Sequence, residues 1–316
     1  MFPSCFLSID PVSLARPDKD SMLQQTLMEI LVGDFDDKTC FRDSDGDFEA
    51  VCAWEGVDCS KHGEIDFDGD FEAVCAWEGV DCSENCEIRN IDWQQHPNVM
   101  DLFGDADGAH DDDVGPVRCG GSIDLRWVPS TVEKLSIPDL CLSGSVDTSV
   151  LPREMFSIQL KGNTFSGTFS TAALPPKIRT VDVSKNRLCG SLDLARGFLP
   201  ERIYIFRVSH NEFSGSVDLS SLPVSLKELW LNANRLSGSI DLRSLPGPLQ
   251  KCYLEQNEFQ QDVVVFPDGK WGSAHVILDN GRFQSFVDTR GIKVRTSASS
   301  DGQTVSLFYG KKGVRW

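Results

Sequence analysis

The most regular feature of this sequence is a spacing of apolar residues around an asparagine. The clearest copy runs from Leu226 to Leu236 and reads Leu-x-x-Leu-x-Leu-x-x-Asn-x-Leu, with Asn234 at the asparagine position. Apolar residues at alternate positions predict a short strand with one buried face, and the asparagine predicts a turn after it. One copy would fit many amphipathic strands, so the prediction depends on how often the spacing returns.

The spacing returns throughout the second half of the chain. Asparagines follow one another at intervals of 23, 25, 23 and 23 residues, at Asn163, Asn186, Asn211, Asn234 and Asn257. Further units align with Val117 and Leu140 before this array and with Gly281 after it. No unit of this length buries its own apolar face, so the units are expected to stack around one continuous core. Because an amide both donates and accepts, the asparagines are expected to form a structural ladder between turns.

The repeat carries a second motif, Ser-Gly-[Ser/Thr]-x-Asp-Leu-x-x-Leu-Pro, at residues 214–223 and 237–246. Over residues 112–287 these motifs resemble the leucine-rich repeat family, closest to its plant-type repeats and similar to leucine-rich repeat proteins of kinetoplastid protists. The resemblance implies an α/β, mostly β, solenoid. The expected shape is a horseshoe whose concave side is one parallel sheet, closed by an N-terminal helix and a short C-terminal strand pair.

A helix is predicted ahead of the repeats, capped by Asp18 or Asp20 and ending near Val32 before a glycine. Its apolar face is expected to consist of Met22, Leu23, Leu27, Ile30 and Leu31. Such a helix would cover the exposed core edge of the first repeat.

The segment 45–60 is repeated without change at 68–83. It contains Cys-x-Trp-x-Gly-Val-x-Cys, which resembles the end of the N-terminal cap in plant-type leucine-rich repeat proteins. In that family the two cysteines pair and the tryptophan packs over the first turn. The candidate disulfides implied here are Cys52–Cys59 and Cys75–Cys82. A cap is used once, so two identical copies indicate a recent tandem duplication or a gene-model error.

These features divide the chain into a loose N-terminus (1–17), a cap with the duplicated segment (18–93), an acidic loop (94–115), the repeats (116–287) and a C-terminal cap and tail (288–316). Charge follows the same division. Residues 34–113 carry a net charge of −21, whereas residues 114–316 carry +5. Phosphate binding needs a basic footprint, so nucleic acid is not expected as the partner.

The compartment is left open by the sequence. There is no apolar run long enough to span a membrane, and the first residues make a poor signal peptide. The 11 cysteines and the family resemblance instead suggest an extracellular or surface location. The odd number leaves at least one cysteine unpaired, and pairing stays open for Cys5, Cys40, Cys86, Cys119, Cys141 and Cys189.

Calcium binding and hydrolysis are two alternatives to simple binding of a partner. Carboxylates at alternate positions give weak calcium candidates, Asp43, Asp45, Asp47, Asp66, Asp68 and Asp70, although both copies lack the glycine and glutamate of an EF-hand loop. A hydrolase built on Asp182, Ser209 and His210 is disfavoured, because neighbours on a strand point to opposite sides. No motif for a cofactor, a phosphate or a catalytic nucleophile occurs, so neither a cofactor nor an enzyme is expected.

The concave side of the sheet is the predicted binding surface. Four residues before the ladder position, side chains leave the sheet between two buried neighbours, and this column contains Gln159, Asp182, Arg207, Trp230, Tyr253 and Ile277. Tryptophan, tyrosine and arginine are the residues enriched at interaction hot spots. The predicted function is therefore non-catalytic binding of a protein or peptide. The alternatives are a surface or secreted structural protein with a calcium-binding acidic cap, and an accessory to an enzyme.

The duplicated segment yields a first prediction. Removing one unit of 23 residues leaves the spacing to the helix and to the repeats intact. A variant lacking residues 45–67 is therefore expected to melt with the same cooperativity as the full chain, followed by circular dichroism. Loss of the cooperative transition would contradict this expectation.

Overall fold

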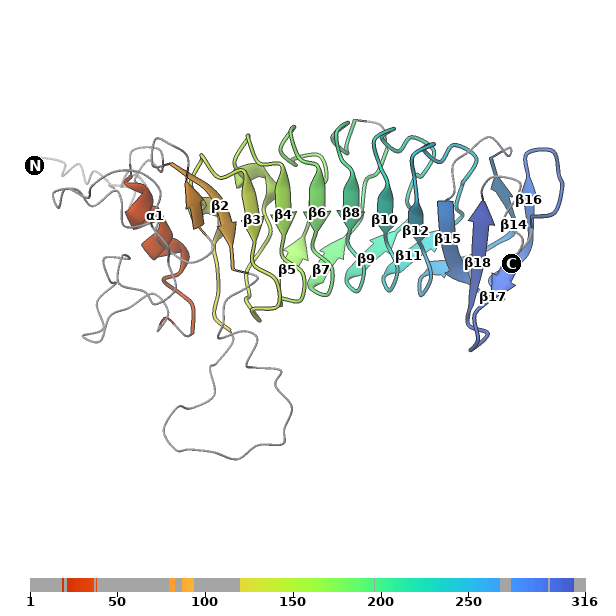
Figure 1. Ribbon diagram of the computed structural model, residues 1–316. Coiled ribbons are helices and arrows are strands. Elements are labelled where there is room, and N and C mark those ends of the chain that lie inside the picture. Colours follow the sequence, from red (N-terminus) through yellow and green to blue (C-terminus); the bar gives the residue numbers. More distant parts are fainter. Residues whose placement is uncertain are drawn as a thin grey trace, which may run out of the picture.

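The computed structural model describes residues 19, 22–36, 38, 80–82, 87–93, 120–195, 197–267, 274–294 and 296–309. Over these residues the chain is a mostly β solenoid whose turns stack along one axis (Figure 1). This confirms the predicted fold class, a leucine-rich repeat solenoid. No helix in the described part of the chain is long and apolar enough to cross a membrane.

One face of the stack is an eleven-stranded sheet. Its strands lie in the spatial order β1 (Val80–Cys82), β2 (Ile88–Asp92), β3 (Lys134–Ser136), β4 (Ser157–Gln159), β6 (Thr180–Asp182), β8 (Ile205–Arg207), β10 (Glu228–Trp230), β12 (Lys251–Tyr253), β15 (Ala274–Asp279), β18 (Thr304–Tyr309) and β17 (Thr296–Ala298). Strands β2 to β15 pair in parallel, one per turn, while β1 and the β18–β17 pair are antiparallel. We call the solvent side of this sheet the concave face, after the prediction.

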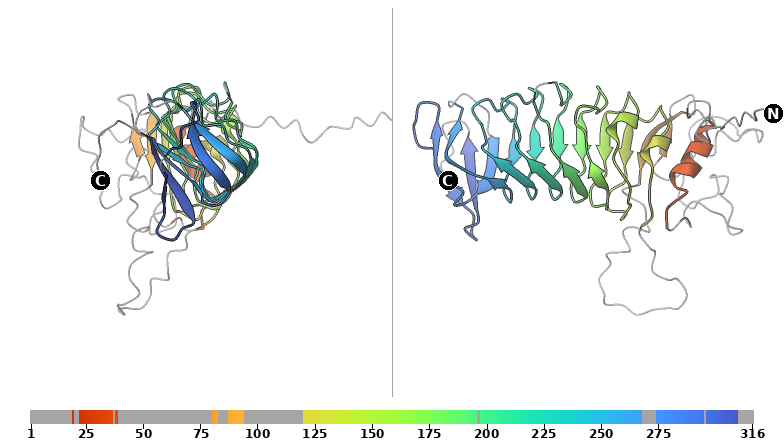
Figure 2. Two further views of the ribbon diagram at one scale, coloured as in Figure 1. Left: turned by 90° about the vertical axis from the view of Figure 1, so that its right-hand side faces the viewer. Right: turned by 180° about the vertical axis from the view of Figure 1, so that it is seen from behind.

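A second set of strands lines another side of the stack, seen from the C-terminal end and from behind in Figure 2. A five-stranded sheet contains β5 (Ser166–Thr168), β7 (Arg187–Gly190), β9 (Glu212–Gly215), β11 (Arg235–Gly238) and β13 (Glu258–Phe259). At its C-terminal end, β14 (Gln261–Phe266) pairs in parallel with β16 (Phe283–Asp288). Single 3₁₀ turns, η7 (Leu125–Trp127) and η8 (Thr148–Val150), form the return path of the first turns.

The apolar columns of the repeat meet in one core between these sheets. Phe165, Phe206 and Phe213 are fully buried there, and the same core continues from the N-terminal helix to β18. Cys252 replaces a larger apolar residue in one column. Burial raises the pKa of its thiol to about 12, so it stays neutral and acts as a small apolar side chain.

The ladder asparagines make the same bonds in turn after turn. The Asn234 Oδ1 atom accepts a hydrogen bond from the backbone of Phe213 at 3.1 Å. Its Nδ2 atom donates to the carbonyls of Val208 and Leu231, at 3.1 and 2.9 Å. Each amide thus joins its own turn to the preceding one. The residue before it is left-handed, with φ of 54° even at Ala233, which turns the chain out of the sheet.

At the C-terminal end of the ladder, one side chain takes the place of backbone carbonyl groups. In the middle of the stack, the backbone N–H groups of Ala233 and Asn234 donate to carbonyls of the next turn. One turn later, the Asp279 carboxylate accepts from the equivalent groups of Gln256 and Asn257, at 2.7 and 3.2 Å. One side chain therefore stands in for two backbone carbonyls and ends the ladder.

The N-terminal helix α1 (Gln24–Leu31) differs from its prediction. Its N-cap is Leu23, which makes no side-chain cap, rather than Asp18 or Asp20, whose structure is not described. Leu23 and Ile30 are exposed, and the buried stripe consists of Leu27, Met28, Leu31, Val32 and Phe35. Leu27, Met28 and Leu31 share one face of the helix at about 100° per residue, whereas Val32 and Phe35 follow its end, so Leu27 and Leu31 are the two residues of the predicted face that are buried.

The segment after α1 closes the first turn. Phe35 forms an antiparallel bridge with Gly121, and the backbone N–H of Ser122 donates to Asp34 at 2.9 Å. Gly121 has a φ of 102°, and a Cβ atom there would lie 2.3 Å from the Asp34 carbonyl oxygen. Glycine is therefore required for this close approach of two backbones.

Several predicted features lie outside the described residues. These are the N-terminus, the first copy of the duplicated segment, the acidic loop, the six aspartates suggested for calcium, and Cys5, Cys40, Cys52, Cys59, Cys75, Cys86 and Cys119. Of the second copy, only the backbone of Val80–Cys82 is described, and it joins the main sheet as β1. Cys141, Cys189 and Cys252 are free thiols.

The ladder geometry yields a second prediction. Asn234→Ala leaves one backbone donor and two carbonyls of the buried turn without this partner, so the free energy of unfolding should fall by about 1–3 kcal/mol. Urea denaturation measures the change. Gln250→Ala is the matched control, because this exposed side-chain amide makes no ladder bond. Equal midpoints for the two variants would refute the structural role.

Candidate functional site

The register of the sheet places the six predicted residues in one row across the concave face. Gln159, Asp182, Arg207, Trp230, Tyr253 and Ile277 lie on β4, β6, β8, β10, β12 and β15, each paired with the next. Asp182 is buried, and the other five are half-buried. The row is continuous, because neighbouring strands of a sheet lie about 4.8 Å apart.

A second row, which the sequence interpretation missed, lies two residues earlier on the same strands. It contains Lys134, Ser157, Thr180, Ile205, Glu228, Lys251 and His275. The signal was present, because side chains at positions i and i+2 of a strand share one face. Two of these residues, Glu228 and Lys251, belong to the charged group around Trp230.

The centre of the face holds a chain of ion pairs. The Arg207 guanidinium lies 2.6 Å from Glu228 and 3.4 Å from Asp182. Glu228 also pairs with Lys251, at 2.9 Å. Burial of Glu228 alone would raise the pKa of its carboxyl, but hydrogen bonds and attraction from Arg207 and Lys251 outweigh this, so the pKa is lowered. Glu228 is therefore favoured in its ionised form, and the network joins two acidic with two basic side chains.

Aromatic rings lie directly against this charged network. The Arg207 guanidinium carbon is 4.3 Å from the centre of the Trp230 ring, and the Lys251 ammonium is 5.7 Å from it. The centroids of Trp230 and Tyr253 are 5.2 Å apart, and His275 meets Tyr253 edge-on at 5.7 Å. Cation–π contact and ring packing fix these side chains in one orientation before any partner arrives.

Three buried polar atoms in this region have no hydrogen-bond partner: Trp230 Nε1, Asn232 Oδ1 and Glu255 Oε2. They come from two adjacent turns, and Asn232 and Glu255 are neighbours two positions beyond the last β10–β12 pair, Trp230 and Tyr253. Buried polar atoms are nearly always hydrogen-bonded, so three unpaired atoms on one face call for an explanation.

Glu255 is the most perturbed carboxyl of the concave face. Burial raises the pKa of its carboxyl to about 7, and repulsion from the nearby Asp279 carboxylate adds to the shift. The Asp279 carboxylate accepts hydrogen bonds from two backbone N–H groups in its capping role. Burial also lowers the pKa of His275 on the same strand as Asp279.

The N-terminal half of the face is lined by small residues. Ser136, Ser157, Ser184 and Ser209 are buried there, and the Ser209 hydroxyl donates to Ser184 at 3.2 Å. His210 is exposed at the turn after Ser209, so the structure does not bring together the serine and histidine of the hydrolase alternative. Among the described residues, no group of three or more His, Cys, Asp or Glu side chains is placed to hold a metal ion.

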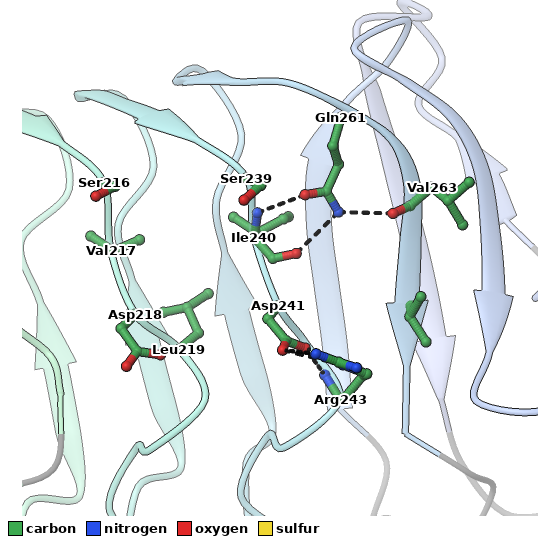
Figure 3. A pocket seen from close by; sticks show the side chains of 11 residues that line it. Ser216, Val217, Asp218, Leu219, Ser239, Ile240, Asp241, Arg243, Gln261 and Val263 are labelled. Carbon is green, nitrogen blue, oxygen red and sulfur yellow. Dashed lines mark hydrogen bonds and ion pairs between the residues drawn. The ribbon is translucent and has the colours of Figure 1, made fainter.

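A groove of about 540 Å³ lies on the side of the five-stranded sheet, near β11 and β14 (Figure 3). Gln261 and Asp241, two of its polar side chains, already bond the backbone. Gln261 Oε1 accepts from the backbone of Ile240 at 2.8 Å, and Asp241 accepts from the backbone of Arg243 at 3.0 Å. Asp124, Asp147, Asp193 and Asp218 close their turns in the same way. The aspartate of the second motif is therefore structural.

Comparison with known proteins gives a limited result. No family model and no curated protein matches this chain. Among solved structures, the BIR2 ectodomain from Arabidopsis thaliana is similar over 67% of this chain and 92% of its own, with 19% identity and a TM-score of 0.41. The PEPR1–AtPEP1 structure is similar over 78% and 35%, with 14% identity and a TM-score of 0.44. The BIR3–SERK2 complex from Arabidopsis thaliana is similar over 66% and 93%, with 17% identity and a TM-score of 0.40.

Identities and TM-scores this low do not establish a family or a function. The description of the fold as a leucine-rich repeat solenoid rests on the period, the core columns and the asparagine bonds of this chain.

The pKa of Glu255 yields a third prediction. Because the folded-state pKa is raised, the native protein loses stability as pH rises from the ordinary carboxyl range through about pH 7. Glu255→Gln should match the wild type near pH 5. Above about pH 8 it should be more stable by about 1–2 kcal/mol, a figure reduced for solvent screening of a half-buried group. Urea denaturation of both proteins at the two pH values measures this, and a difference that does not vary with pH would contradict it.

Proposed function

We propose that this chain is a non-catalytic binding protein and that its concave face receives a peptide or an extended segment of another protein. The observation that carries the proposal is the fixed group of Arg207, Trp230 and Tyr253 on three adjacent turns. These side chains are already held in place, so they offer a large contact area and lose little conformational entropy on binding. They are also the residue types enriched at hot spots.

The competing explanation is that Trp230 and Tyr253 only stabilise the sheet. Cross-strand aromatic pairs do this, and the 5.2 Å contact fits. A binding role explains in addition why Arg207, Trp230 and Tyr253 all keep accessible surface on the open side of the sheet, next to one another on three turns. A partner that covers these side chains gains the contact area that hot spots use.

Charge supports a protein partner rather than a nucleic acid. The central ion pairs balance, and the Asp279 carboxylate adds an acidic group at the C-terminal end of the face. A phosphate backbone would need an excess of basic side chains on the surface it contacts.

A random dodecapeptide display library, selected on the full chain, tests the proposal. Peptides that bind should lose about 2 kcal/mol or more of affinity with Trp230→Ala, close to 30-fold. Val224→Ala is the matched control, because this side chain is 80% exposed and lies outside both concave rows. Fluorescence anisotropy on folded variants measures the affinities. Selected peptides that bind both variants equally well would refute the use of the concave face.

A further inference from the structure

A groove of about 570 Å³ borders the concave face where β6 and β8 begin. It is lined by Phe156, Arg179, Thr180, Glu201, Arg202, Tyr204 and Ser225. Backbone bonds fix its wall from turn to turn. Arg179 donates to Phe156 at 2.8 Å, Tyr204 to Arg179 at 2.7 Å, and Lys227 to Tyr204 at 2.9 Å. The groove lies one turn from Trp230, because β8 is paired with β10.

The groove carries positive charge that the described residues do not neutralise. Neighbouring positions along this rim are paired, as in Arg89–Glu133 and Lys177–Glu154. Arg179 and Arg202 are exposed, and neither forms an ion pair with a carboxylate in the described part of the chain. Glu201 is the one acid that lines the groove, so the local balance is positive in a protein whose total charge is −18.

The groove also offers apolar surface. The Tyr204 side chain is 42% exposed, and the ammonium group of Lys227 lies 4.3 Å from its ring centre while bonding its hydroxyl. This contact fixes the ring beside Arg179. Guanidinium groups bind planar oxyanions through two parallel hydrogen bonds, and an aromatic wall at their side excludes water.

We propose that this groove binds an acidic side chain, Asp or Glu, of the same peptide or protein that occupies the concave face. Arg179 and Arg202 hold the carboxylate, and Tyr204 and Phe156 contact the adjoining methylene groups. The inference rests on the proposed function. It narrows the partner to a segment with an apolar or aromatic residue for the centre of the face and an acid that reaches the rim.

The same peptide library tests the inference with different variants. Selection on the wild type should enrich Asp or Glu at one position. On the double variant Arg179→Glu/Arg202→Glu, that preference should disappear or change to Lys or Arg, and the affinity of wild-type peptides should fall about tenfold or more. Arg243→Glu is the matched control, because it reverses an exposed arginine outside the groove, at Asp241. It should keep the acidic preference. Urea midpoints confirm that the variants are folded.

The outcomes separate the two proposals. If no selected peptide depends on Trp230, the concave-face function itself is wrong. If peptides depend on Trp230 but show no acidic preference, or if the double variant keeps that preference, only the rim assignment is overturned. Inorganic phosphate serves as a second probe. Binding of phosphate that requires both arginines, without any selected acidic peptide, would also overturn the carboxylate assignment.

Discussion

The fold depends on a hydrogen-bond requirement that no single turn meets alone. Each strand of the main sheet is three residues long in the middle of the stack, and its backbone groups find partners only on the turns before and after. The asparagine amide extends this pairing past the end of the strand, where the chain leaves the sheet. The stability of such an array is the sum of many contacts between neighbouring turns. A terminal turn has a neighbour on one side only, so the two ends need structures that cover them.

The period of the sequence was enough to predict the stack. Apolar positions that recur every 23 to 25 residues can share one core only if the repeats stack. The register of β4 to β15 shows this stacking, because equivalent positions pair on neighbouring strands. The ends were not predictable in this way, because the structures that close them occur once and do not repeat along the sequence. The sequence alone does not show that the Asp279 carboxylate replaces two backbone carbonyls. It also does not show that the backbone of Gly121 lies against that of Asp34. The face of α1 was predicted wrongly for a related reason, since eight residues leave the direction of the buried stripe poorly defined.

The candidate site was only partly visible in the sequence. Alternation along the strands identified the row that contains Arg207, Trp230 and Tyr253. The charges that hold these side chains come from Glu228 and Lys251 in the other row, and their pairing depends on distances across strands. The pKa of Glu255 depends on how deeply one carboxyl is buried and on the nearness of Asp279. Neither quantity follows from spacing, so the electrostatic character of the face required the structure.

The Asp279 cap has a consequence for how this protein can change over evolutionary time. An array with an open end could lengthen simply by adding turns at that end. Here the Asp279 carboxylate takes the two backbone bonds at the end of the asparagine ladder, and β18 covers the open edge of β15, so a turn added beyond β15 would find that edge already occupied. The N-terminal turn is closed as tightly, by the backbone of Phe35 against a position where only glycine fits. Duplication of a repeat is therefore tolerable only in the interior, between two fixed boundaries, and it would lengthen the concave face without altering either end.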